Sequence, residues 1–185
     1  MVALKDWTVE EFLQRTAFPS PAWAGGSAGA VAAAVATALT SKIAAISQLD
    51  YPDTLDDPEQ FLILAERDMQ GYRQLQNDRA NPQALPKSLK ASLAVSSAIL
   101  TLCIEGAYVV GDLLPRVKPV MRPDLLVAAQ LYYSGAFSAW INMQSNLGAV
   151  GSAIPDIVAQ QENQLERLRC SIDTWVQQCT LRESI

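Results

Sequence analysis

Residues 18–30 read Phe-Pro-Ser-Pro-Ala-Trp-Ala-Gly-Gly-Ser-Ala-Gly-Ala, and an alanine-rich helical pattern continues from there to about residue 48. A proline-bounded turn leads into two glycines, which carry no Cβ and let the backbone approach other groups closely. Ser27 is predicted to cap the helix, whose first-turn N–H groups and positive dipole end suit an anionic ligand. The alternative is a helix entry that packs tightly against a neighbouring element. Both interpretations predict a helix with close neighbours.

Five further segments have helical spacing, and each begins at a start signal. Thr8 and Glu11 form a predicted capping box for a short helix that runs to about residue 16. Prolines or Asp-Pro pairs open longer helices over residues 57–79, 86–114, 123–147 and 155–180. No segment alternates apolar and polar residues over a convincing length. The sequence therefore predicts an all-α fold, an antiparallel helical bundle of about five long helices plus a short N-terminal helix.

The composition indicates a single domain, 1–185, with more apolar residues than a small monomer needs. Half of the 185 residues are hydrophobic, 18% are charged, and the net charge is −5. The apolar excess predicts a subunit interface, most simply that of a homodimer. No basic run is present, so we expect no nucleic-acid partner. Residues 27–47 are apolar for long enough to span a membrane, but nine alanines and Lys42 favour a central helix instead, so we expect a cytoplasmic protein.

The chain contains no histidine, which limits the chemistry available to it. Zinc sites built on imidazole and Ser-His or Cys-His nucleophile pairs are excluded. Acid–base catalysis would therefore fall to Asp, Glu, Lys, Tyr or bound water. The cysteines Cys103, Cys170 and Cys179 lie far apart in apolar helical patterns, and we expect reduced, buried thiols and no metal site.

Two groups of polar residues near helix ends are candidates for a functional site. The first is Gly25, Gly26 and Ser27, at the start of the alanine-rich helix. The second is Asp78, near the end of the helix predicted over residues 57–79. The alternative for Asp78 is a solvated carboxylate on the protein surface.

A third group of candidates lies on the helix predicted over residues 123–147. Asp124 stands at its start, and Ser138, Asn142 and Asn146 follow four residues apart, so they share one helix face. The alternative for Asp124 is a helix cap. The alternative for Asn142 and Asn146 is a pair of amides that bond across a helix–helix or subunit interface.

The order of these features resembles the cyclodeaminase/cyclohydrolase family over nearly the whole chain. Residues 20–27, Ser-Pro-Ala-Trp-Ala-Gly-Gly-Ser, are similar to the family's Ser-Pro-x-Pro-Gly-Gly-Gly-Ser turn. Asp78-Arg79-Ala80 resembles its Asp-Ala stretch, and residues 138–142, Ser-Ala-Trp-Ile-Asn, resemble its Asn-Val-x-Ile-Asn segment. Asp124 matches the family's Asp before the fifth helix. The family includes the cyclodeaminase domain of formiminotransferase-cyclodeaminase and stand-alone methenyltetrahydrofolate cyclohydrolases.

The resemblance implies a role in one-carbon metabolism, as a methenyltetrahydrofolate cyclohydrolase or a formiminotetrahydrofolate cyclodeaminase. Both reactions move protons and need no metal or redox cofactor, and the tetrahydrofolate derivative is the substrate. A carboxylate with a shifted pKa can perform such steps, so the resemblance implies Asp78 as the general acid–base. It implies substrate-binding roles for Gly25, Gly26, Ser27, Asp124, Ser138 and Asn142.

Two residues of the turn favour an alternative function. Trp23 and Ala24 stand where the family has proline and glycine, and an indole there would fill space that a substrate needs. The alternative is a catalytically inactive relative, a helical dimer that binds another small molecule or a protein partner.

Overall fold

Six α-helices dominate the computed structural model, which describes residues 3–19, 23–52, 55, 57–149, 151 and 156–181. No strand occurs in these residues, so the all-α prediction is confirmed. Residues 20–22 of the turn and Pro155 lie outside the described residues. Short 3-10 helices span Leu4–Asp6 and Pro119–Met121, and the α-helices are α1 Val9–Ala17, α2 Gly25–Ser47, α3 Glu59–Asp78, α4 Leu85–Leu113, α5 Arg122–Ala149 and α6 Asp156–Leu181.

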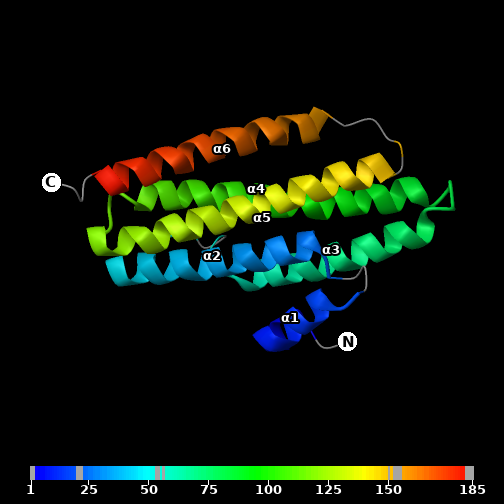
Figure 1. The fold of residues 1–185 in the computed structure, drawn as a ribbon, viewed down its shortest axis with the longest axis horizontal. Helices are drawn as coiled ribbons and strands as arrows, with labels where there is room; N and C mark the ends of the chain where they lie inside the picture. The colour runs from blue at the N-terminus through cyan, green and yellow to red at the C-terminus, as the bar shows by residue number, and fades with distance from the viewer. Residues whose placement is uncertain are drawn as a thin grey trace.

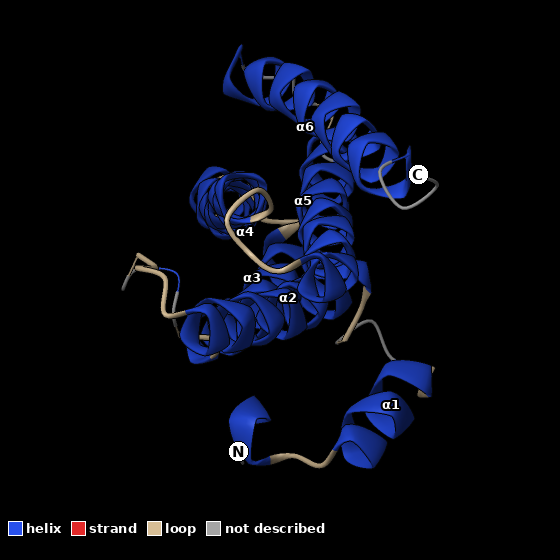
Figure 2. Cartoon of the chain, turned by 90° about the vertical axis from the view of Figure 1, so that its left-hand side faces the viewer, coloured by secondary structure: helices blue, strands red, loops and turns tan. Residues whose placement is uncertain are grey.

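Helices α2 to α5 form the central bundle, and α6 packs on its outside against α5 and α4 (Figure 1). Helix α5 lies against both α2 and α4, and α3 contacts the same two helices. Helices α3 and α5 therefore face each other across the bundle centre. The view along the bundle shows α1 set apart from these helices (Figure 2).

Helices α2 and α3 are offset along the bundle axis. Gly26, in the first turn of α2, lies beside Asp68 in the middle of α3. Beyond Asp68, α3 continues over residues 69–78, a length of about 15 Å at 1.5 Å per residue. The first turn of α2 therefore lies at a level that α3, α4 and α5 pass through, inside the bundle rather than at its end (Figure 1).

Small residues bring α2, α4 and α5 close together. A Cβ on Gly135 of α5 would lie 2.9 Å from the carbonyl oxygen of Gly29 in α2 and 2.9 Å from Cys103 Sγ in α4. Ala33 and Ala36 on α2 are fully buried. The close neighbours predicted for the alanine-rich helix are thus confirmed.

Two helices, α2 and α4, are long and apolar enough to cross a membrane by length and composition alone. Within the most apolar window of each, 50% of α2 and 44% of α4 is buried inside the bundle. A helix that is apolar on several faces is typical of a bundle core, which is where α2 and α4 lie.

The three cysteines are free, but only Cys103 is buried as expected. Burial raises the pKa of the Cys103 thiol. Cys170 is exposed and Cys179 is partly buried. The expectation of three buried thiols is wrong because α6, which carries the latter two, contacts the bundle along one side only.

The N-terminal segment is held by a capping box and an aromatic cluster. The Thr8 hydroxyl accepts from the Glu11 N–H at 3.1 Å, and the Glu11 carboxylate accepts from the Thr8 N–H at 2.7 Å, as predicted. The Trp23 ring packs edge-on against Trp7, with 4.8 Å between centroids, and near Phe12. The Trp23 indole is therefore buried against the N-terminal segment.

Candidate functional site

The buried carboxyl of Asp68, on α3, is the centre of the candidate site. Asp68 is 8% exposed and is the one charged residue among the buried side chains that the structure describes. An ionised carboxylate that loses its hydration is costly unless hydrogen bonds replace the water. Burial raises the pKa of Asp68, and hydrogen bonds from Asn142 and Ser27 act in the opposite direction. These properties make Asp68 a candidate acid–base group.

Ser27, in the first turn of α2, is a side-chain partner of Asp68. The helix begins at Gly25 with Ala24 as N-cap and no side-chain cap, so the prediction that Ser27 caps it is wrong. The buried Ser27 hydroxyl instead donates to the carbonyl oxygen of Ala65 at 3.1 Å. It also lies 3.4 Å from Asp68 Oδ2. The hydroxyl is in the third helical position, so it turns inward toward α3 instead of back to the helix start.

Gly26 lies where no side chain fits. A Cβ at this position would lie 2.5 Å from Asp68 Oδ2 and closer still to Asn142 Nδ2. The two side chains therefore meet directly over the Gly26 backbone. The neighbouring Gly25 is exposed, and its carbonyl oxygen accepts a hydrogen bond from the Ser138 hydroxyl. The glycine pair thus lets α2 approach both α3 and α5.

The polar face predicted on α5 points toward the other bundle helices. Asn142 reaches across the bundle to hydrogen-bond Asp68. One turn further along, the buried Asn146 donates from Nδ2 to Ser92 Oγ on α4 at 3.0 Å. Both amides thus bond across a helix–helix interface, as the alternative predicts, and Asn142 also belongs to the Asp68 cluster.

The structure places Asp78 outside this cluster. Asp78 ends α3, about 15 Å along the helix from Asp68. Its Oδ2 accepts from Gln74 Nε2 at 2.9 Å. With Lys87 and Ser88 it lines a separate pocket of about 330 Å³. Asp78 is therefore not brought together with the glycine–serine turn, and its catalytic role stays a prediction.

Asp124 lies near the opposite end of α5 from the cluster. It precedes Asn142 by eighteen residues, or about 27 Å along the helix. Its Oδ2 lies 3.8 Å from Lys42 Nζ, and both side chains are more than half exposed. Exposed pairs at this distance contribute little to stability. Within one chain, Asp124 does not join the site.

Sequence reasoning missed Asp68, although the sequence contains a signal for it. Phe61, Leu64, Ala65, Asp68 and Leu75 follow one helical stripe, and Asp68 is the only charged member. Carboxylates are almost never fully buried without partners. A carboxylate in a core stripe is therefore a stronger indication of function than one at a helix end.

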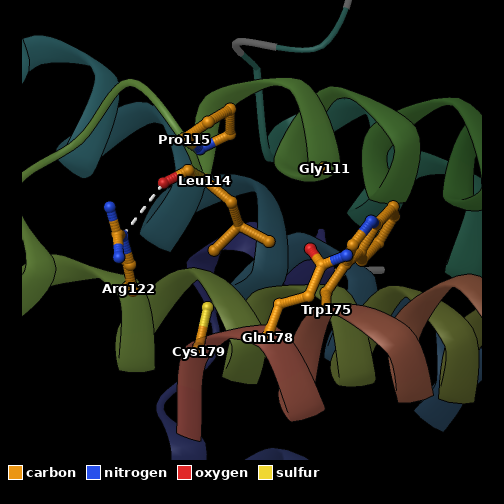
Figure 3. Close-up of a pocket in the computed structure, with 7 residues that line it drawn as sticks. All are labelled: Gly111, Leu114, Pro115, Arg122, Trp175, Gln178 and Cys179. Carbon is orange, nitrogen blue, oxygen red and sulfur yellow. Dashed lines mark hydrogen bonds between the residues drawn. The ribbon is translucent and has the colours of Figure 1, made fainter. Parts of the chain in front are cut away.

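Another hollow lies between the ends of α4 and α6 and the start of α5 (Figure 3). Its volume of about 200 Å³ is below the usual range for small-molecule sites. Arg122 Nε donates to the carbonyl oxygen of Leu114 at 3.2 Å, which satisfies a carbonyl at the end of α4. Cys179 and Gln178 line it from α6, and none of the predicted site residues does. The role of Arg122 here is structural.

The stability of the protein is predicted to depend on the charge of Asp68. Its raised pKa means that the folded state binds the carboxyl proton of Asp68 more tightly than the unfolded chain does. The stabilisation from protonated Asp68 is therefore fully present below the unfolded pKa of about 3.9. It is lost as the pH rises through the folded pKa. Asp68→Asn keeps the shape without the charge, and we expect its advantage in free energy of unfolding over wild type to grow between pH 4 and pH 8. Urea unfolding at several pH values measures this difference, and a difference independent of pH contradicts the prediction.

The chain matches the family model of formiminotransferase-cyclodeaminase over residues 8–166. No curated protein is similar enough to match it. Its structure is similar to the crystal structure of formiminotetrahydrofolate cyclodeaminase from Thermotoga maritima, with a TM-score of 0.74 and 20% sequence identity. The alignment covers 95% of this chain and 94% of that chain, and at this identity it supports the fold. Because the family model spans most of the chain, including the cluster around Asp68, the protein belongs to the formiminotransferase-cyclodeaminase family.

Proposed function

We propose that the protein acts on a one-carbon-substituted tetrahydrofolate, as a methenyltetrahydrofolate cyclohydrolase or a formiminotetrahydrofolate cyclodeaminase. Family membership supports this substrate class. The observation that carries the reaction type is the buried Asp68 carboxyl with its partners from two other helices. A carboxyl with a raised pKa is protonated more readily than a free one, which suits a group that both accepts and donates a proton. We therefore assign the acid–base role to Asp68 instead of Asp78.

One carboxyl is enough for the proton transfers of either reaction. In the cyclohydrolase reaction, water adds to the methenyl carbon and loses a proton, and the nitrogen released when the ring opens gains one. In the cyclodeaminase reaction, the nitrogen that closes the ring loses a proton, and the expelled ammonia leaves with one. Asp68 can accept the first proton and return the second. The hydrogen bonds from Ser27 and Asn142 stabilise the ionised form, which precedes the first transfer and is restored by the second.

The residues around Asp68 are proposed to hold it and to admit the substrate. Asn142 fixes the carboxyl, and Gly26 leaves the space in which the two side chains meet. Ser138 ties α5 to the Gly25 carbonyl. The first turn of α2 lies at the level of Asp68 and has no side-chain cap. Its free N–H groups can therefore donate to polar substrate atoms. The predicted role of Asp124 finds no support in contacts within one chain.

Asp68→Asn is expected to lower turnover by at least about 100-fold, the usual minimum share of a general acid–base. The matched control is Asp78→Asn on the same helix, which is expected to stay within about threefold of wild type. Loss of the near-ultraviolet absorbance of methenyltetrahydrofolate against the buffer rate measures cyclohydrolysis, and ammonia release from formiminotetrahydrofolate measures cyclodeamination. Loss of activity in Asp78→Asn alone would restore the assignment of Asp78. A wild-type protein that neither binds nor converts either folate would support the inactive relative.

We also propose a soluble, cytoplasmic homodimer. Val35 on α2 and Val127 and Ile141 on the adjacent α5 are large apolar residues that are 49%, 52% and 43% exposed. Exposed apolar side chains on neighbouring helices favour a subunit interface. A second copy that covers these side chains would account for the apolar excess of the sequence. Light scattering of the purified protein is expected to give twice the chain mass of 20.1 kDa. A monomer at micromolar concentration contradicts the proposal.

A further inference from the structure

The hydroxyl of Ser96, on α4, is buried and finds no hydrogen-bond partner within the described part of the chain. The two serines one and two turns earlier on α4 are both paired. Ser92 Oγ accepts from Asn146, and Ser88 Oγ donates to the carbonyl oxygen of Leu85 at 3.1 Å. A buried hydroxyl without a partner is costly, and such groups commonly bind a buried water. The position of Ser96 therefore calls for a partner.

The contacts between α4 and α5 define a regular antiparallel register. Ser92 on α4 pairs with Asn146 on α5. Cys103, further along α4, lies against Gly135, further back along α5. Between these two contacts each helix advances by eleven residues in opposite directions. Intermediate residues of the two helices can therefore be paired by level.

This register places Ser96 in the layer of the candidate site. One turn beyond Ser92, Ser96 comes level with Asn142 on α5. Ser92 also lies against α3, because a Cβ on Gly71 would lie 3.6 Å from the Ser92 Cα. Because α3 and α4 are antiparallel, one turn forward from Ser92 on α4 corresponds to about one turn back from Gly71 on α3. Asp68 therefore comes level with Ser96. By this register, each of the four bundle helices contributes one polar side chain to the same layer. These side chains are Ser27, Asp68, Ser96 and Asn142.

Packed helices generally leave room for a water molecule between short polar side chains. Axes of packed helices lie about 8–10 Å apart, and the short side chains of serine and aspartate leave part of that distance unspanned. Asp68 is bonded by Asn142 and Ser27 and has acceptor capacity on its carboxyl for further donors. A buried water typically makes about three hydrogen bonds. Ser96 Oγ, the Asp68 carboxyl and the Asn142 amide oxygen would supply three.

We propose that Ser96 holds a buried water molecule against Asp68 and Asn142 and is thereby a positioning residue for the Asp68 carboxyl. The presence of this water is independent of the reaction, whereas its effect on turnover rests on the proposed function. When Asp68 gives its proton to the substrate, the water donates a hydrogen bond to the carboxylate that forms. The water itself makes and breaks no covalent bond.

The first test needs no substrate and compares Ser96→Ala with Ser88→Ala. Ser88 is a matched control because it is also a buried serine of α4, but its hydroxyl bonds its own helix. Burial, Asn142 and Ser27 set the pKa of Asp68, so carbon-13 NMR titration of its carboxyl reports a lost donor directly. We expect the Asp68 titration to move to higher pH in Ser96→Ala and to stay unchanged in Ser88→Ala. Water-to-protein cross-relaxation at the Ser96 β-protons is expected in the wild-type protein, and its absence, or an unchanged titration, overturns the proposal.

The second test separates positioning from binding in folate turnover. We expect Ser96→Ala to lower kcat about tenfold and to leave KM within about twofold. The variant removes a hydrogen bond from the Asp68 carboxylate, which forms during the reaction, and removes no contact with the substrate. Ser88→Ala is expected to keep the wild-type kcat. If the wild-type protein turns over no folate, the proposed function fails, and the titration still decides the water site. If turnover is present but Ser96→Ala matches wild type in both kcat and titration, the inference alone fails.

Discussion

Gly26→Ala is expected to remove at least about 99% of the folate turnover, because the new methyl group occupies the space in which Asp68 and Asn142 meet. The added Cβ would lie 2.5 Å from Asp68 Oδ2, well inside van der Waals contact. At least one of the two side chains has to move by about 1 Å, and misplacements of this size cost on the order of 100-fold in rate. The same overpacking is expected to lower the free energy of unfolding by about 1–3 kcal/mol.

The matched control for Gly26→Ala is Gly71→Ala, three residues after Asp68 on α3. There an added Cβ would lie 3.6 Å from the nearest atom outside its own helix, the Ser92 Cα, which is ordinary contact. We expect this variant to keep both its turnover and its stability, or to gain slightly from the better helix propensity of alanine. Steady-state assays and urea unfolding of the two variants measure the contrast. Wild-type turnover in Gly26→Ala would mean that the Asp68–Asn142 contact is dispensable.

The helices could be predicted from sequence because their signals are local. The Thr8–Glu11 capping box, Pro58 before α3 and Pro86 in the first turn of α4 place helix starts within two residues of those observed. These signals act through the backbone of the same few residues and do not depend on tertiary contacts. The close packing around α2 was also predictable, since alanine and glycine have little side chain to separate neighbouring helices.

The candidate site could be predicted only in part, because it depends on which helices meet. Gly26, Asp68 and Asn142 are far apart in sequence and come together only through the offset of α2 against α3. Motifs in the sequence indicate the glycine turn and Asn142. The family resemblance points to Asp78, whereas the physical cost of a carboxylate in an apolar stripe points to Asp68. The sequence predicts Ser27 as the helix cap, since sequence alone does not show where the helix begins.

Gly135→Ala is expected to destabilise the protein by about 1–3 kcal/mol, the range for overpacking a well-packed core. The added Cβ would lie 2.9 Å from the Gly29 carbonyl oxygen, 2.9 Å from Cys103 Sγ and 3.2 Å from the Ala33 Cβ. Two of these three atoms belong to α2, and the carbonyl and the Cβ cannot turn away by changing a rotamer. The strain can be relieved only if α2 and α5 separate, which would loosen the contacts along both helices.

Gly148→Ala, on the same helix, separates this packing effect from helix propensity. Among the residues that the structure describes, no atom outside its own helix lies within 4 Å of the position that its Cβ would take. Alanine is favoured over glycine in a helix by about 1 kcal/mol, so Gly148→Ala is expected to be stabilised by up to that amount. The propensity gain is common to both variants, and their difference in free energy of unfolding therefore measures the cost of the clash. Equal stabilities in urea unfolding would contradict the close approach of α2 and α5. They would also put in question the contact between Gly26 and Asn142, one turn away from Gly29.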